Sequence, residues 1–196
     1  GEIVEERAWW APRYAVDAPA PPPEELGELL RDSVRLRLRA DVPVGCYLSG
    51  GLDSSLTTAL AVEQTDHQLR TFSLAFRDPL FDESAFQRQV AEELGTRHHV
   101  IEIGPEEITD AFQDVMRHLE TPVIRSAGVP LYLLAQSTRE QGITVVATGE
   151  GADEALGGYV WYKTQKVRNW IGRNLGSFLP KLTRRALLAA IGIELD

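Results

Sequence analysis

Residues 42–55 have the sequence VPVGCYLSGGLDSS, in which a short apolar run ends abruptly at a serine and two glycines. Beyond this stretch, Leu56, Leu60 and Ala61 recur at helical spacing. The pattern predicts a strand over residues 42–48, then a tight turn, then a helix. Backbone N–H groups and the positive end of a helix dipole converge at such a turn, which favours the binding of an anion.

The same alternation of apolar runs and helical patterns continues on both sides of this segment. Further strands are expected over residues 70–76, 98–103 and 143–147, and helices over residues 24–40, 83–94, 105–119 and 131–141. Apolar strands that alternate with helices are typical of a parallel sheet covered on both faces. The predicted fold class is therefore α/β, a doubly wound parallel sheet with helices on both faces.

The turn itself has the composition of a phosphate-binding loop. Gly50 and Gly51 allow the backbone to approach an anion closely, and the hydroxyl groups of Ser49, Ser54 and Ser55 add donors. The spacing matches neither the G-x-G-x-x-G nor the G-x-x-x-x-G-K-[ST] motif. A simple turn in which Ser54 caps the helix is the structural alternative.

A second polar loop, TGEGADEALGGY over residues 148–159, follows the last predicted strand. Ligands of open parallel sheets bind at the carboxyl ends of the strands, so both loops are expected to border one crevice. They would bring together four carboxylates, those of Asp53, Glu150, Asp153 and Glu154. Carboxylates repel phosphate unless a cation lies between them, and Mg²⁺ accepts both kinds of ligand. An acidic surface turn is the alternative interpretation of this loop.

These two loops closely resemble those of the synthetase domain of glutamine-dependent asparagine synthetases, which are N-type ATP pyrophosphatases. The likeness extends over residues 9–170 and includes Asp82-Glu83-Ser84, residues 94–99 (LGTRHH), and the stretch from Glu120 to Arg125. The serine-glycine loop alone is shared with other AMP-forming synthetases, and residues 149–159 narrow the choice. The resemblance implies a fold like that of the adenine nucleotide alpha hydrolases.

The resemblance also implies an activity and a set of site residues. ATP would be cleaved between its α and β phosphates, the side-chain carboxylate of aspartate would be adenylated, and ammonia would convert the adenylate to asparagine. The nucleotide would be held by Tyr47, Leu48, Ser49, Gly50, Gly51, Leu52, Asp53, Ser54, Leu74, Thr148 and Gly149. Asp53 and Asp153 would bind Mg²⁺, and Glu150, Asp153 and Arg125 would take part in catalysis. For Arg125, a surface salt bridge is an equal alternative to pairing with the substrate carboxylate.

By the same resemblance, residues 1–23 are the end of an N-terminal glutaminase domain and a proline-rich linker. The apolar and aromatic residues of the segment 1–11 by themselves predict a strand there. Residues 24–165 form the ATP pyrophosphatase domain, and residues 166–196 begin an incomplete helical extension. The chain is thus expected to be a piece of a longer enzyme. It would lack the glutaminase domain that supplies ammonia and a downstream lysine, and would bind nucleotide with little turnover.

Three alternatives to asparagine formation stay open at this point. One is a related carboxylate-activating ligase, such as a β-lactam synthetase or a peptide-cyclising homologue, because residues 122–124 (PVI) replace threonines found in some asparagine synthetases. Another is a non-catalytic nucleotide-binding module. The last is a tRNA-modifying ligase, against which residues 149–159 and the acidic composition both argue.

The composition limits the partners of the chain. The 196 residues include 20 Lys and Arg against 29 Asp and Glu, a net charge of −9, which argues against general nucleic-acid binding. Cys46 is the single cysteine, so no internal disulfide forms, and burial in the core is expected for it. The sequence has no apolar run long enough for a membrane span, and a cytoplasmic location is expected. A homodimer is compatible with these features.

Overall fold

The computed structural model describes residues 5, 7–11, 21–65, 69–121, 123 and 125–174. Within these ranges the strands form one sheet, in which all neighbours pair in parallel in the order β3-β2-β1-β4. The strands are β1 (Val44–Tyr47), β2 (Arg70–Phe76), β3 (Arg97–Ile103) and β4 (Val145–Ala147). The predicted parallel sheet is confirmed, and β2 has the predicted bounds.

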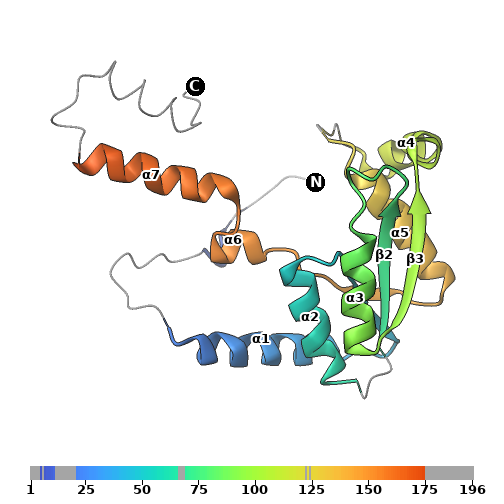
Figure 1. Cartoon of the computed structure of the whole chain (residues 1–196), viewed down its shortest axis with the longest axis horizontal. Helices are drawn as coiled ribbons and strands as arrows, with labels where there is room; N and C mark the ends of the chain where they lie inside the picture. Colours follow the sequence, from blue (N-terminus) through green and yellow to red (C-terminus); the bar gives the residue numbers. More distant parts are fainter. Residues whose placement is uncertain are drawn as a thin grey trace.

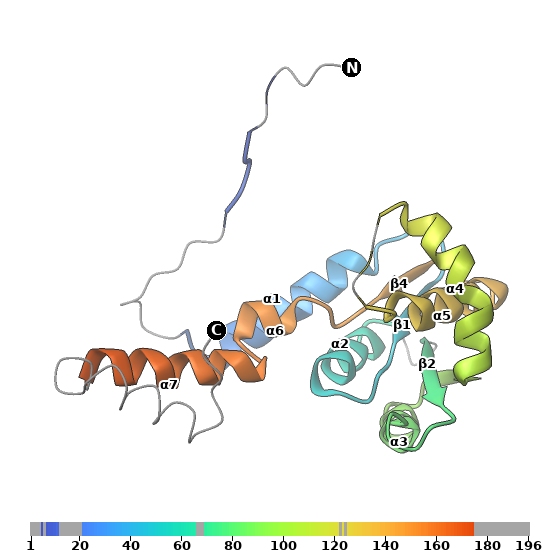
Figure 2. The same cartoon turned by 90° about the horizontal axis from the view of Figure 1, so that it is seen from above.

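Helices cover both faces of this sheet, as Figures 1 and 2 show. They are α1 (Pro23–Arg37), α2 (Leu52–Val62), α3 (Ser84–Leu94), α4 (Pro105–Leu119), α5 (Gly128–Glu140), α6 (Ala152–Leu156) and α7 (Val160–Asn174). The helices α2 and α3 pack on one face, with α1 against α2, and α4 and α5 pack on the other. The doubly wound arrangement is therefore confirmed, while α6 and α7 extend away from the sheet.

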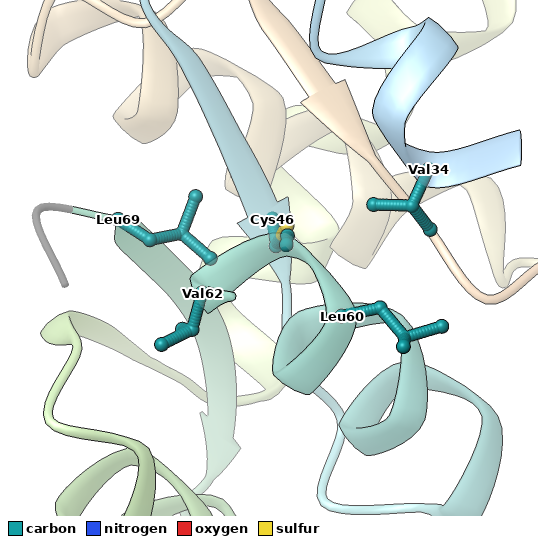
Figure 3. Packing of buried hydrophobic residues seen from close by; sticks show 6 residues of the cluster. Val34, Cys46, Leu60, Val62 and Leu69 are labelled. Atoms are coloured by element: carbon teal, nitrogen blue, oxygen red, sulfur yellow. The ribbon is translucent and has the colours of Figure 1, made fainter. Parts of the chain in front are cut away.

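The core lies in two layers, one on each side of β1. Cys46 is fully buried between β1 and α2, in a cluster that includes Val34, Leu60, Val62 and Leu69 (Figure 3). This burial confirms the expectation for the cysteine and raises the pKa of its thiol to about 11. On the opposite face, Phe72, Leu134 and Ile143 pack against Tyr47 and Val146. Because successive side chains of β1 point to opposite faces of the sheet, this strand contributes to both layers.

The order of the strands fixes the place of a crevice. The chain proceeds outward from β1 through β2 to β3, and then returns to place β4 on the other side of β1. The connection from β1 to β2 carries α2 on one face of the sheet, whereas the connection from β3 to β4 carries α4 and α5 on the other, so a crevice opens at the carboxyl ends of β1 and β4. The serine-glycine loop follows β1 and the acidic loop follows β4.

Two local features differ from the sequence-based expectation. The strand expected over residues 1–11 is wrong for the described residues 5 and 7–11, which pair with no strand, and Trp9 is 93% exposed. An extended segment is stable as a strand only when it pairs with a neighbour. The short helix α6 was not anticipated within the acidic loop, and it lies between the left-handed residues Gly151 and Gly157. Every helix in the described ranges is too short or too polar to span a lipid bilayer.

Candidate functional site

A cavity of about 310 Å³ lies at the carboxyl ends of β1, β2 and β4. Of the candidate binding and catalytic residues named from the sequence, it is lined by Tyr47, Leu48, Ser49, Asp53, Ser54, Leu74, Thr148, Gly149, Glu150, Asp153 and Glu154. Gly50, Gly51 and Leu52 belong to the same loop without lining the cavity. The serine-glycine loop and the acidic loop therefore border one cavity.

The serine-glycine loop is held in shape by its own hydroxyl groups. The hydroxyls of Ser49 and Ser54 lie 2.8 Å apart, and the Ser49 amide donates to Ser54 Oγ over 3.1 Å. Ser54 Oγ also lies 3.2 Å from the Gly51 carbonyl oxygen, and the Gly51 amide donates to Ser49 Oγ over 3.3 Å. These bonds fix the turn between β1 and α2 before any ligand is present.

The same loop leaves the start of α2 open to an anion. Gly51 is the residue before the helix and supplies no side-chain cap, so the first-turn amides are not capped from within the loop. Gly50 has φ +83°, and a Cβ there would lie 2.9 Å from Phe86 Cβ. The backbone of the loop therefore fits closely against α3, which only a glycine allows at this position.

Direct contact between backbones joins the two loops. A Cβ on Gly149 would lie 2.8 Å from the Ser54 nitrogen and 2.9 Å from the Asp53 carbonyl carbon. Glycine is thus required where the chain leaving β4 passes over the first turn of α2. This close approach brings the acidic loop to the amides at the start of α2.

The acidic loop places its carboxylates beside this contact. A Cβ on Gly158 would lie 1.9 Å from Asp153 Oδ1, so the half-buried Asp153 carboxylate packs directly over the Gly158 backbone. Glu154 Oε1 accepts a hydrogen bond of 2.6 Å from the Tyr159 hydroxyl. That bond raises the pKa of Tyr159 to about 12, with further contributions from Asp153 and Glu150, and lowers the pKa of Glu154.

The residues present fit a cation that is shared with phosphate. Asp53, Glu150, Asp153 and Glu154 line the cavity, and in the described ranges none of them forms an ion pair. The described residues also contain no group of three His, Cys, Asp or Glu side chains that could hold a metal ion by itself. Mg²⁺ typically binds one or two carboxylates and completes its coordination with phosphate oxygens.

Several lining residues were missed from the sequence. Phe76 and Phe81 form an edge-to-face pair with ring centroids 6.4 Å apart, and Gln87 of α3 lies beside them in the lining of the cavity. These residues belong to no recognisable motif, because their place depends on how α3 and residues 77–83 fold back over β2. The apolar residues at the end of β2 are the one feature of the sequence that could have pointed to this part of the cavity lining.

Other residues considered in the sequence lie away from the cavity. Arg125 is exposed, does not line the cavity and forms no ion pair with a described residue, and its role in catalysis stays a prediction. His98 Nδ1 lies 2.9 Å from Thr71 Oγ1, and burial lowers the pKa of this imidazole. His99 Nε2 lies 3.2 Å from Ser137 Oγ. Neither histidine lines the cavity, as expected for packed side chains.

Comparison with known proteins places this geometry in context. The family model described as asparagine synthase matches residues 25–192. The chain is 37% identical over 140 residues to asparagine synthetase [glutamine-hydrolyzing] 1 of Bacillus subtilis, covering 71% of this chain and 22% of the relative. It is 38% identical over 151 residues to asparagine synthetase B of Escherichia coli, covering 70% and 27% of the two chains. The chain thus spans about a quarter of the length of these relatives.

Among solved structures, the fold is similar to that of the NH₃-dependent NAD synthetase from Campylobacter jejuni. The TM-score is 0.50 at 20% sequence identity, and the match covers 71% of this chain and 62% of the other. At this identity the likeness concerns the fold alone, and it agrees with the predicted fold class.

Proposed function

The chain belongs to the asparagine synthase family, and from that membership we propose that its cavity binds ATP and adenylates the side-chain carboxylate of aspartate. The observation that carries the proposal is the contact of Gly149 with Asp53 and Ser54, which joins an anion-binding turn to an acidic loop. ATP is a ligand that needs both, because its phosphates require amide donors and a cation.

In this proposal the serine-glycine loop and the start of α2 hold the departing pyrophosphate. Backbone groups of Tyr47, Leu74 and Gly149 hold the adenosine, since all three residues line the cavity. A carboxylate oxygen of aspartate attacks the α phosphorus, the bond between the α phosphorus and the bridging oxygen breaks, and pyrophosphate leaves. Amides directed at the phosphates stabilise the developing charge without reorganisation.

The second half-reaction forms the amide. Ammonia attacks the acyl carbon, the bond to AMP breaks, and the attacking nitrogen loses a proton. Glu150 lines the cavity and is assigned to the acyl group and the amine. Mg²⁺ would be held by Asp53 and Asp153 and would neutralise phosphate charge as pyrophosphate departs. In relatives named glutamine-hydrolyzing, the name itself points to glutamine as the nitrogen source.

The proposal is tested by the charge of Asp53. We expect the chain to bind ATP with Mg²⁺, and Asp53→Asn to weaken this binding at least about a hundredfold, because a cation ligand and charge neutralisation are lost together. The measurement is calorimetric titration with ATP in Mg²⁺ and in EDTA. Where the enzyme turns over, ATP–pyrophosphate exchange should fall by orders of magnitude.

The matched control is Asp110→Asn, the same substitution at an exposed position of α4 outside the cavity, which should bind ATP as the unmodified chain does. Near-normal exchange in Asp53→Asn would contradict the metal assignment. Mg²⁺-independent ATP binding would instead favour a non-catalytic nucleotide-binding module. Stimulation of exchange by a carboxylate other than aspartate would point to a related carboxylate-activating ligase.

A further inference from the structure

Gln87 occupies an unusual position in α3. Its side chain is 4% exposed, yet it lines the cavity, and Nε2 donates a hydrogen bond of 2.9 Å to the Leu74 carbonyl oxygen. No described residue donates to Gln87 Oε1, which is buried. A buried amide oxygen without a donor lowers stability, so packing alone does not explain a glutamine here.

The Leu74 carbonyl that Gln87 contacts lies in the part of β2 that extends beyond the end of β1. In β2 and the residue before it, the backbone N–H and C=O groups of odd-numbered residues point toward β3, as the hydrogen bond from the Arg97 amide to the Leu69 oxygen shows. The backbone groups of even-numbered residues point toward β1, as the hydrogen bond from the Leu48 amide to the Phe72 oxygen shows. Leu74 therefore also faces the β1 side, but the pairing register of β1 with β2 ends at Tyr47 and Phe72.

The Leu74 backbone thus offers an amide N–H and a carbonyl to the cavity. A carbonyl oxygen accepts two hydrogen bonds, and Gln87 uses one of them. The second lone pair of the Leu74 carbonyl can accept from an amino group on one edge of a base, and the neighbouring Leu74 N–H can donate to a ring nitrogen beside that amino group. A 6-amino purine has this edge, whereas a 6-oxo purine has the reverse order of donor and acceptor.

We infer that Gln87 is a positioning residue for the purine: its amide holds the Leu74 carbonyl in the direction that selects a 6-amino over a 6-oxo base. This inference rests on the proposed function, since it requires a nucleotide in the cavity. The serine-glycine loop packs against the same turn of α3, because a Cβ on Gly50 would lie 3.0 Å from the backbone nitrogen of Gln87. The turn of α3 that carries Gln87 therefore packs against the serine-glycine loop, while the Gln87 side chain bonds the strand β2 beside the cavity.

The experiment is calorimetric titration with the Mg²⁺ salts of ATP and inosine triphosphate, which differ at position 6 of the base. The unmodified chain should prefer ATP. Gln87→Met keeps the length of the side chain and removes both polar atoms, so it should lower ATP affinity roughly tenfold and reduce the preference for ATP over inosine triphosphate. Its thermal midpoint should stay equal or rise, because the unpartnered oxygen is gone.

Gln89→Ala is the matched control, since Gln89 is an exposed glutamine of the same helix that bonds Glu93 over 3.0 Å. Gln87→Asn, too short to reach Leu74, should lose the base preference as Gln87→Met does. An unchanged preference in both variants overturns the inference, as does an unmodified chain that binds both nucleotides equally. A chain that binds neither nucleotide overturns the proposed function itself, and with it this inference.

Discussion

The two loops that border the cavity are built in opposite ways. In the serine-glycine loop, the hydroxyls of Ser49 and Ser54 bond each other and the backbone, and Ser54 is 8% exposed. In the acidic loop, the five-residue helix α6 has no buried residue, and the Tyr159 to Glu154 bond lies on the exposed surface. One loop is organised by its own hydrogen bonds, and the other presents carboxylates that form no ion pair with any residue the structure describes.

This difference assigns separate tasks to the two loops. A pre-organised turn with uncapped helix amides can bind phosphate at little cost in conformational entropy. Unpaired carboxylates oppose phosphate by themselves and favour it only through a cation. In the proposed function, the first loop therefore supplies most of the affinity and the second makes that affinity depend on Mg²⁺.

The largest effect is expected where the two loops touch. Gly149→Ala would place a Cβ 2.8 Å from the Ser54 nitrogen and would force the backbones apart. We expect ATP affinity to fall roughly a hundredfold, because the displaced loops would no longer hold amide donors and carboxylates around the same phosphates. The free energy of unfolding should fall by about 1–3 kcal/mol, the usual cost of overpacking. Titration calorimetry and urea unfolding measure the two quantities.

The matched control for this change is Gly27→Ala. Gly27 lies inside α1, and a Cβ there meets nothing within 4 Å. The alanine should raise the free energy of unfolding by about 0.5–1 kcal/mol through helix propensity, with ATP binding unchanged. If Gly149→Ala also left ATP binding unchanged, the two loops would not act on one ligand.

An intermediate effect is expected within the serine-glycine loop. Ser54→Ala removes the acceptor of the Ser49 amide from a buried site and should lower the free energy of unfolding by about 1–2 kcal/mol. Ser55→Ala is the control, because the Ser55 hydroxyl donates only to the Gly51 carbonyl, over 2.7 Å, at the exposed side of the turn. Equal losses in both variants, measured by urea unfolding, would show that the internal bonds do not organise the loop.

The same comparison explains what the sequence could predict. The turn at residues 48–55 follows from local rules, since glycine freedom, hydroxyl donors and helix periodicity act over a few residues. The strand over residues 70–76 is likewise a local apolar run. The roles of Gln87 and Phe81 could not be predicted, because they line the cavity only through the packing of α3 and its preceding loop against β2. Arg125 belongs to the motif but not to the lining of the cavity, and a local motif does not determine which of its side chains reach the cavity.

The smallest effect is expected in the acidic loop, at the bond between Tyr159 and Glu154. This bond raises the pKa of the phenol to about 12 and lowers that of the carboxyl. Its contribution to stability is therefore complete between the unfolded pKa values of the two groups. It declines as pH falls through the lowered pKa of Glu154 or rises through that of Tyr159. Because both groups lie at the surface, unfolding measurements should barely register its loss.

Spectrophotometric titration of the phenols is the sensitive measurement. Glu154→Gln should move the titration of one tyrosine down from about pH 12 toward its ordinary value near 10, and Tyr159→Phe should remove that component altogether. Addition of Mg²⁺ and ATP should lower the same pKa in the unmodified chain, because a cation beside Asp153 and Glu150 offsets their repulsion of the phenolate. A tyrosine titration that ignores Mg²⁺ and ATP would mean that the acidic loop does not receive the cation, and the division of tasks between the two loops would fail there.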